Sequence, residues 1–184
     1  SVKKGIKKSL LVVDMPKGSY SNVILAKKNA KKICRLTGCD AVKIESNKKN
    51  FDIIKELKRN KIPVMGHIGY TPQFKKKFKV EGKTKLQEKL LLKEALNIEK
   101  AGAFSIVLEC VTPASAKRIT SRLSIPTIGI GSSKYCDGQI LVTDDMLGLS
   151  GFYPKFVKKY LNLSRIIEKA VEKYTTEVKL NKFP

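Results

Sequence analysis

The chain has 184 residues, a length that predicts one domain with a large buried core. Hydrophobic residues make up 42% and charged residues 29%, which excludes wholesale disorder, and no apolar run approaches the ~20 residues needed to span a bilayer. Lys+Arg 38 against Asp+Glu 16 give a formal net charge of +22, which raises the question of a nucleic-acid partner.

Lysine carries most of this charge, with 33 Lys and only 5 Arg. Nucleic-acid recognition favours the planar guanidinium of Arg. The lysines are also spread along the chain in doublets such as Lys27-Lys28 and Lys158-Lys159, on the polar faces of expected helices. We therefore interpret the charge as an ordinary lysine-rich surface and expect neither nucleic acid nor a membrane as a partner.

The cysteines and the single histidine limit the kinds of metal site that the chain could build. Cys34, Cys39, Cys110 and Cys136 form no CxxC pair, and one histidine is too few for a His-rich zinc site. We expect reduced, mostly buried thiols and a cytoplasmic location.

Short apolar runs alternate with longer helix-like segments along the chain. The runs cover residues 10–13, 41–44, 62–65, 104–108, 125–128 and 139–142, and the helices are expected at 23–36, 51–59, 84–100, 113–123 and about 154–180. Strands this apolar are typical of a parallel sheet buried on both faces, so the sequence predicts an α/β fold. Six βα units of about 31 residues suit part of a (β/α)₈ barrel and suit an open doubly wound sheet equally.

Polar groups capable of acid–base or metal chemistry follow the expected strands. In α/β folds the active site lies at the carboxyl ends of the strands. Repetition over six runs is therefore a stronger signal than one acidic residue. In chain order the groups are Asp14, Glu45, His67, Glu109, the turn Gly129-Ile130-Gly131, and Asp144 with Asp145.

Two of these carboxylates, Asp14 and Glu45, could supply hard oxygen ligands for Mg²⁺, or they could be helix caps or surface ion-pair partners. Lys43 precedes Glu45 by two residues, so both side chains share one face of a strand. A lysine in an apolar strand needs a partner, which could be a substrate carboxylate, a Schiff-base carbonyl, or a structural ion pair with Glu45 or Asp14.

His67 lies between Gly66 and Gly69, where the backbone permits close approach of a ligand, although a lone histidine is more often structural. Glu109 follows a mostly apolar run, so its carboxylate is expected to be partly desolvated, which suits a general base.

Several long segments, in order, resemble motifs of the ketopantoate hydroxymethyltransferase family. The resemblance runs from about Leu10 to the closing Lys182-Phe183-Pro184. The segments are Asp14-Met15-Pro16, Val64-Met65-Gly66-His67-Ile68-Gly69-Tyr70-Thr71-Pro72-Gln73, and residues 102–111, 124–131 and 136–149.

The resemblance implies a (β/α)₈ TIM barrel of the phosphoenolpyruvate/pyruvate-like type, as a single partial domain over residues 1–184. In this interpretation strands 3–8 are present and strands 1–2, with the family's Asp-Ser pair, have no counterpart before Leu10. The chain starts at Ser1 without Met, which fits a start that was processed away or a chain that begins mid-protein. Lys17 and Ser132-Ser133 depart from the family pattern.

The resemblance also implies an activity, namely transfer of a hydroxymethyl group from 5,10-methylenetetrahydrofolate to 3-methyl-2-oxobutanoate to form 2-dehydropantoate in pantothenate synthesis. By resemblance, Asp14 and Glu45 bind Mg²⁺, Asp14, Lys43 and His67 contact the substrate, and Glu109 is the catalytic proton acceptor. Family members form homo-oligomers, commonly decamers. The alternatives are a Schiff-base aldolase that uses Lys43 and an inactive truncated or scaffold homologue.

Overall fold

The structure is a computed structural model that describes residues 2–46 and 50–184, and strands alternate with helices over most of it. The elements in chain order are α1 Val2–Gly5, β1 Val12–Asp14, α2 Val23–Thr37, β2 Ala41–Glu45, α3 Phe51–Arg59, β3 Val64–Gly69, α4 Lys85–Ala101, β4 Ser105–Glu109, α5 Pro113–Thr120, β5 Thr127–Ile130, β6 Gly138–Gln139, α6 Thr143–Leu147 and α7 Leu163–Lys179.

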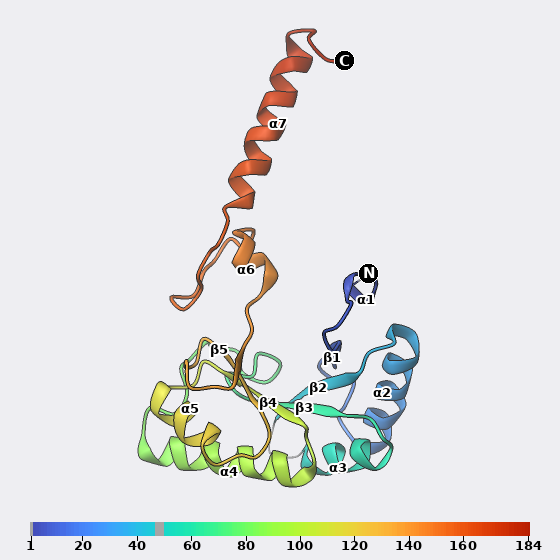
Figure 1. Ribbon diagram of the computed structural model, residues 1–184, viewed down its shortest axis with the longest axis vertical. Helices are drawn as coiled ribbons and strands as arrows, with labels where there is room; N and C mark the ends of the chain where they lie inside the picture. The colour runs from blue at the N-terminus through green and yellow to red at the C-terminus, as the bar shows by residue number, and fades with distance from the viewer. Residues whose placement is uncertain (1, 47–49) are drawn as a thin grey trace. The chain divides into compact units, whose positions relative to one another are not determined.

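Six parallel strands form one sheet in which each strand lies beside its neighbours in the sequence, in the order β1-β2-β3-β4-β5-β6 (Figure 1). A doubly wound sheet reverses its strand order at a switch point, whereas a (β/α)₈ barrel keeps its strands in sequence order. The sheet is therefore the six-stranded part of a (β/α)₈ barrel, and β1 to β6 take the places predicted for strands 3–8. This confirms the barrel prediction and decides against the doubly wound alternative.

Helices α2 to α5 each follow a strand, and α3 and α4 run along one side of the sheet (Figure 1). The core between helices and sheet is mainly aliphatic and includes Ile44, Leu57, Ile98 and Ile106, all essentially without solvent exposure. Each such side chain stabilises the fold by roughly 1.5–3 kcal/mol. Gly66 in β3 permits α4 to pack closely, because a Cβ there would lie 2.5 Å from Ile98 Cγ2.

One predicted strand was wrong. Residues 139–142 were expected to form the sixth strand, but β6 covers only Gly138 and Gln139, which pair with Ile128 and Gly129. β6 is an edge strand paired on one side, so little ladder bonding is available to extend it. The short helices α1 and α6 were not predicted.

The chain divides into two compact units, residues 1–139 and 140–184. The first contains the sheet with α1 to α5, and the second contains α6 and α7. Helix α7 lies within the range 154–180 that was expected to be helical. The assignment of residues 1–184 to a single domain stays a prediction. Within the described part of the chain, no helix is both long and apolar enough to cross a membrane.

Candidate active site

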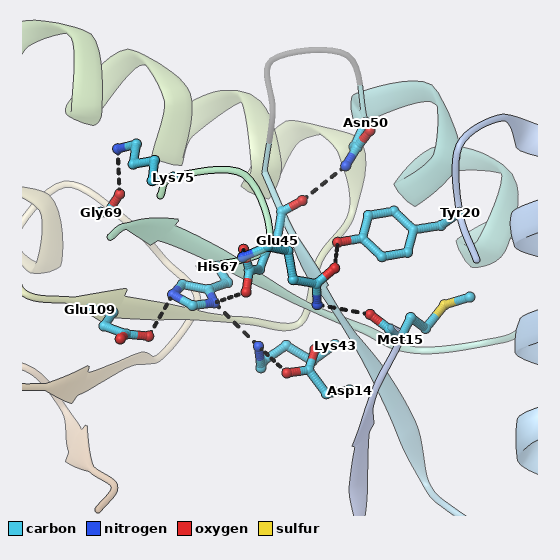
Figure 2. Close-up of polar contacts among 11 residues, drawn as sticks. Asp14, Met15, Tyr20, Lys43, Glu45, Asn50, His67, Gly69, Lys75 and Glu109 are labelled. Carbon is cyan, nitrogen blue, oxygen red and sulfur yellow. Dashed lines mark hydrogen bonds and ion pairs between the residues drawn. The ribbon is translucent and has the colours of Figure 1, made fainter. Parts of the chain in front are cut away.

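The carboxyl ends of the parallel strands bring the predicted site residues to one edge of the sheet. Asp14, Glu45 and Glu109 are the last residues of β1, β2 and β4. The register places Lys43 opposite Asp14, and His67 opposite Glu45. All five side chains lie together in Figure 2. The structure therefore assembles every residue that was singled out for catalysis, substrate or metal.

Lys43 occupies the centre of this group. Its Nζ lies 2.7 Å from Asp14 Oδ2 and 3.2 Å from His67 Nδ1 (Figure 2). An ammonium group can only donate hydrogen bonds, so Nδ1 of a neutral His67 accepts, and the ring proton is on Nε2. The partner that Lys43 needed in an apolar strand is Asp14, because the register sets these two residues side by side on adjacent strands.

His67 and Glu109 form the second half of the site. His67 is 2% exposed, and its Nε2 lies 3.2 Å from Glu109 Oε2, whose side chain is 20% exposed. Despite the short distance the pair is not aligned as a hydrogen bond, so Nε2 is a buried polar atom without a hydrogen-bond partner among residues 2–46 and 50–184. A buried nitrogen in this state is a position where a substrate oxygen could be recognised beside Glu109.

Glu45 is a buried carboxylate, with 1% of the residue exposed. Its Oε2 accepts a hydrogen bond from the main-chain N–H of Gln73 at 2.9 Å, and its Oε1 lies 3.9 Å from His67 Nδ1. Burial raises the pKa of Glu45, and the nearby Asp14 charge raises it further. His67, the Gln73 N–H and Lys43 act in the opposite direction on this pKa. A buried carboxylate of this kind is stabilised by any additional cation.

Sequence reasoning missed the residues that hold the Glu45 side of the site. The side chain of Gln73 donates to Met15 O at 3.0 Å and accepts from Tyr20 Oη at 2.6 Å. Burial, followed by the Glu45 charge, raises the pKa of Tyr20, which keeps its phenol protonated as the donor. The available signal was the segment Tyr70-Thr71-Pro72-Gln73, which directly follows the strand that carries His67.

The carboxylates expected after the sixth run are placed differently. Asp144 and Asp145 lie in the first turn of α6, in the second compact unit, rather than at a strand end. This corrects the prediction that every run ends at the same edge, because β6 stops before the run does. The turn after β5 does form, with Gly131 at φ 57°.

A separate cavity of about 380 Å³ lies between the end of β3 and α4. Its apolar walls are Ile68, Phe74, Leu90 and Leu91, and none of the five site residues lines it. Ile68 and His67 are consecutive in β3 and point to opposite faces of the strand. The cavity therefore lies on the helix side of β3 and is distinct from the candidate active site.

The donor chemistry of the site is compatible with Mg²⁺. Among the residues that the structure describes, no three His, Cys, Asp or Glu side chains are grouped as a ligand set. Mg²⁺ in proteins commonly uses only one or two carboxylates and completes its shell with water and substrate oxygens. Asp14 and the buried Glu45 supply two hard oxygen ligands, and the influence of Asp14 on the pKa of Glu45 reports their proximity. These residues fit the group.

An α/β barrel that gathers carboxylates, a lysine and a histidine at the carboxyl edge of its strands belongs to the class of barrel enzymes. The particular family follows from comparison, since residues 1–184 match the family described as ketopantoate hydroxymethyltransferase. The chain belongs to this family of transferases.

Curated relatives match over the whole chain. The 3-methyl-2-oxobutanoate hydroxymethyltransferase of Pelagibacter ubique (strain HTCC1062) is 51% identical over 184 residues, which are 100% of this chain and 72% of that protein. The Thermotoga maritima enzyme of the same name is 48% identical over 189 residues, which cover 100% of this chain and 70% of that protein.

Solved structures show a similar fold at low identity. A Burkholderia cenocepacia J2315 protein described as a phosphonomutase has a TM-score of 0.53 at 14% identity, over 95% of this chain and 70% of that one. The carboxyl transferase domain of Rhizobium etli pyruvate carboxylase has a TM-score of 0.52 at 17% identity, over 70% of this chain and 24% of that one. At such identities the likeness concerns the fold alone.

Proposed function

We propose that the protein transfers a hydroxymethyl group from 5,10-methylenetetrahydrofolate to 3-methyl-2-oxobutanoate, forming 2-dehydropantoate for pantothenate synthesis. The observation that carries this proposal is the line of close contacts from Asp14 through Lys43 and His67 to Glu109 at the carboxyl edge of the sheet. It occurs in a chain whose relatives are named for this transfer.

The hydrogen at C3 of the oxo acid is weakly acidic, so the reaction needs a base and stabilisation of negative charge on the 2-oxo oxygen. In this proposal Glu109 accepts the C3 proton, since its carboxylate is four-fifths shielded from solvent. His67 lies against Glu109 and presents its Nε2 proton where the negative charge develops. The resulting carbanion equivalent at C3 then forms a bond to the one-carbon unit, and water supplies the hydroxyl oxygen.

Substrate binding is assigned to the other half of the site. Lys43 donates charge-assisted hydrogen bonds to the substrate carboxylate, and Asp14 keeps its ammonium in place. Asp14 and Glu45 would hold Mg²⁺, which supplies Lewis-acid stabilisation at the 2-oxo group. The two halves thus separate binding from proton removal on neighbouring strands.

Replacement of the proposed base gives the direct test. Glu109→Gln keeps the shape of the side chain but removes its basicity, so exchange of the substrate C3 hydrogen into D₂O, followed by ¹H NMR, should slow by about 10²–10⁴-fold. Glu172→Gln on the exposed face of α7 is the matched control and should exchange at the wild-type rate. Exchange by Glu109→Gln at the wild-type rate, with Mg²⁺ still bound, would show that another group is the base.

The aldolase alternative requires a neutral Lys43 amine that attacks a carbonyl. The contact of Lys43 Nζ with Asp14 at 2.7 Å instead favours the charged ammonium. Borohydride reduction in the presence of the oxo acid separates the two chemistries, because only an imine is trapped. A mass increase of the protein equal to the reduced adduct would support the aldolase.

The proposal extends to a cytoplasmic homo-oligomer of the kind that the family forms. Two features support it. The four cysteines are free thiols, as a reducing compartment maintains them, and α7 exposes Ile166, Ile167, Val171 and Tyr174. Sedimentation velocity at micromolar concentration should show an assembly larger than a monomer, and a monomer would contradict this part of the proposal.

A further inference from the structure

Gln73 makes three hydrogen bonds that no part of the proposed reaction uses directly. Its main-chain N–H donates to Glu45 Oε2 at 2.9 Å, its Nε2 donates to Met15 O at 3.0 Å, and its Oε1 accepts from Tyr20 Oη at 2.6 Å. The three partners are 28, 58 and 53 residues away in sequence. One residue of the β3–α4 connection therefore joins the end of β2 to the segment after β1.

These bonds act on the two carboxylates from different sides. The N–H fixes one oxygen of Glu45, which leaves Oε1 on the side that faces His67. Met15 follows Asp14 directly, and its N–H already donates to Lys43 O at 3.0 Å. With its carbonyl bound by Gln73, Met15 is held on both sides. β1 has only three residues, so these contacts contribute much of what fixes Asp14.

Burial makes the arrangement rigid. Met15 is 0% exposed and Tyr20 is 3% exposed, so the hydrogen bonds to Gln73 are shielded from competing water. Hydrogen-bond partners of metal ligands commonly determine ligand orientation and, with it, metal affinity. Gln73 stands in this relation to Glu45 directly and to Asp14 through Met15.

We propose that Gln73 is a positioning residue that sets the separation of the Asp14 and Glu45 carboxylates and thereby the affinity of the site for a divalent cation. The inference rests on the proposed function, which assigns these two carboxylates to Mg²⁺. It predicts that the side chain of Gln73 affects Mg²⁺ binding without contact with the ion.

Isothermal titration calorimetry with Mg²⁺ alone tests the proposal. Gln73→Leu keeps the approximate volume and the main-chain N–H to Glu45 but removes both side-chain hydrogen bonds. We expect Mg²⁺ affinity to fall by about 10–100-fold. Tyr20→Phe removes one of these bonds and should cause a smaller loss. Turnover by Gln73→Leu should recover towards the wild-type rate at saturating Mg²⁺, which a general loss of folding would not allow.

Gln87→Leu is the matched control, since Gln87 also ties down this connection, through Lys83 N at 2.9 Å, but is not bonded to the site. An equal loss of affinity in Gln87→Leu would show that only loop stability matters. Mg²⁺ binding at the wild-type level by Gln73→Leu, or by Tyr20→Phe if Gln73→Leu does not fold, would overturn the inference.

Glu45→Gln separates failure of the inference from failure of the proposed function. If Glu45→Gln binds Mg²⁺ as the wild type does, the metal assignment itself is wrong, and the positioning role that rests on it is overturned as well. If Glu45→Gln loses Mg²⁺ while Gln73→Leu retains it, the metal assignment stands and only the role of Gln73 is overturned.

Discussion

Lys43 determines the charge balance of the candidate active site. It is the cation that lies between Asp14 and His67, with its Nζ 2.7 Å and 3.2 Å from them. Without this ammonium, Asp14 and Glu45 would repel each other more strongly on neighbouring strands. The same group is the one placed to meet an incoming carboxylate, so its structural and substrate-binding roles are compatible.

Lys43→Met should raise the KM for 3-methyl-2-oxobutanoate about 10–100-fold, because a charge-assisted hydrogen bond contributes roughly 1.5–3 kcal/mol. Steady-state kinetics at fixed folate concentration measure this change. Lys89→Met, on the exposed surface of α4, serves as the control. An unchanged KM in Lys43→Met would exclude a contact between Lys43 and the substrate carboxylate.

A second prediction at this scale concerns Glu56, which lies away from the site. Hydrogen bonds from Lys27 and Asn60 lower the pKa of Glu56 below its ordinary value of 4.5. A lowered folded-state pKa stabilises the protein above pH 4.5, and this contribution disappears as the pH falls through the folded value. Glu56→Gln should therefore lower Tm by about 2 °C or less at pH 7.

The difference in Tm between Glu56→Gln and the wild type should shrink towards zero as the pH falls well below 4.5. Thermal unfolding followed by circular dichroism at several pH values measures it. A difference that stays constant from pH 7 to the acid limit would mean that the ion pair with Lys27 does not contribute.

At the scale of elements, the ends of β3 and β4 are joined where the site is built. The N–H of Tyr70 donates to Glu109 O at 2.8 Å, and Gly69 has φ 94°. A Cβ at Gly69 would lie 2.2 Å from Glu109 O and 2.7 Å from Val111 Cγ2. Only glycine permits β3 to turn this closely beside Glu109.

Gly69→Ala should destabilise the protein by about 2 to 5 kcal/mol, since it combines a left-handed backbone with a steric clash. Urea unfolding measures the loss. Gly18→Ala is the matched control, because Gly18 has φ 87° but open space around its Cβ position. A loss in Gly69→Ala no larger than in Gly18→Ala would show that the contact with Glu109 is not limiting.

Most elements could be predicted because their signals are local. The helix that ends at Thr37 is capped by Gly38 in the left-handed conformation, as its Thr-Gly ending indicates. The strand expected at residues 139–142 was wrong because apolar character does not show whether a strand has a partner on both sides. Strand pairing is a property of the sheet rather than of the run.

At the scale of the whole molecule, the net charge of +22 surrounds an active site with three carboxylates. Lysines on α2 such as Lys28, Lys31 and Lys32 are exposed. A surface of this kind attracts anions over long range, and salt screens the attraction. Such a field would also draw an anionic oxo acid towards the protein.

Binding to random-sequence DNA should be detectable only at low salt and should be lost by 0.15 M salt, because scattered lysines give no specific phosphate contacts. Fluorescence anisotropy with a labelled duplex measures this dependence. Tight binding that persists at 0.15 M salt would revive a nucleic-acid function for the lysine surface.

The sequence by itself determined which residue types follow each strand, since alternating elements force the carboxyl ends of parallel strands to one edge. It therefore named Asp14, Lys43, Glu45, His67 and Glu109. Only the tertiary structure decided how they pair. Register placed Lys43 beside Asp14. Packing brought Gln73 to Glu45, Met15 and Tyr20, because contacts between residues 28 to 58 positions apart depend on how the elements pack and have no local signature.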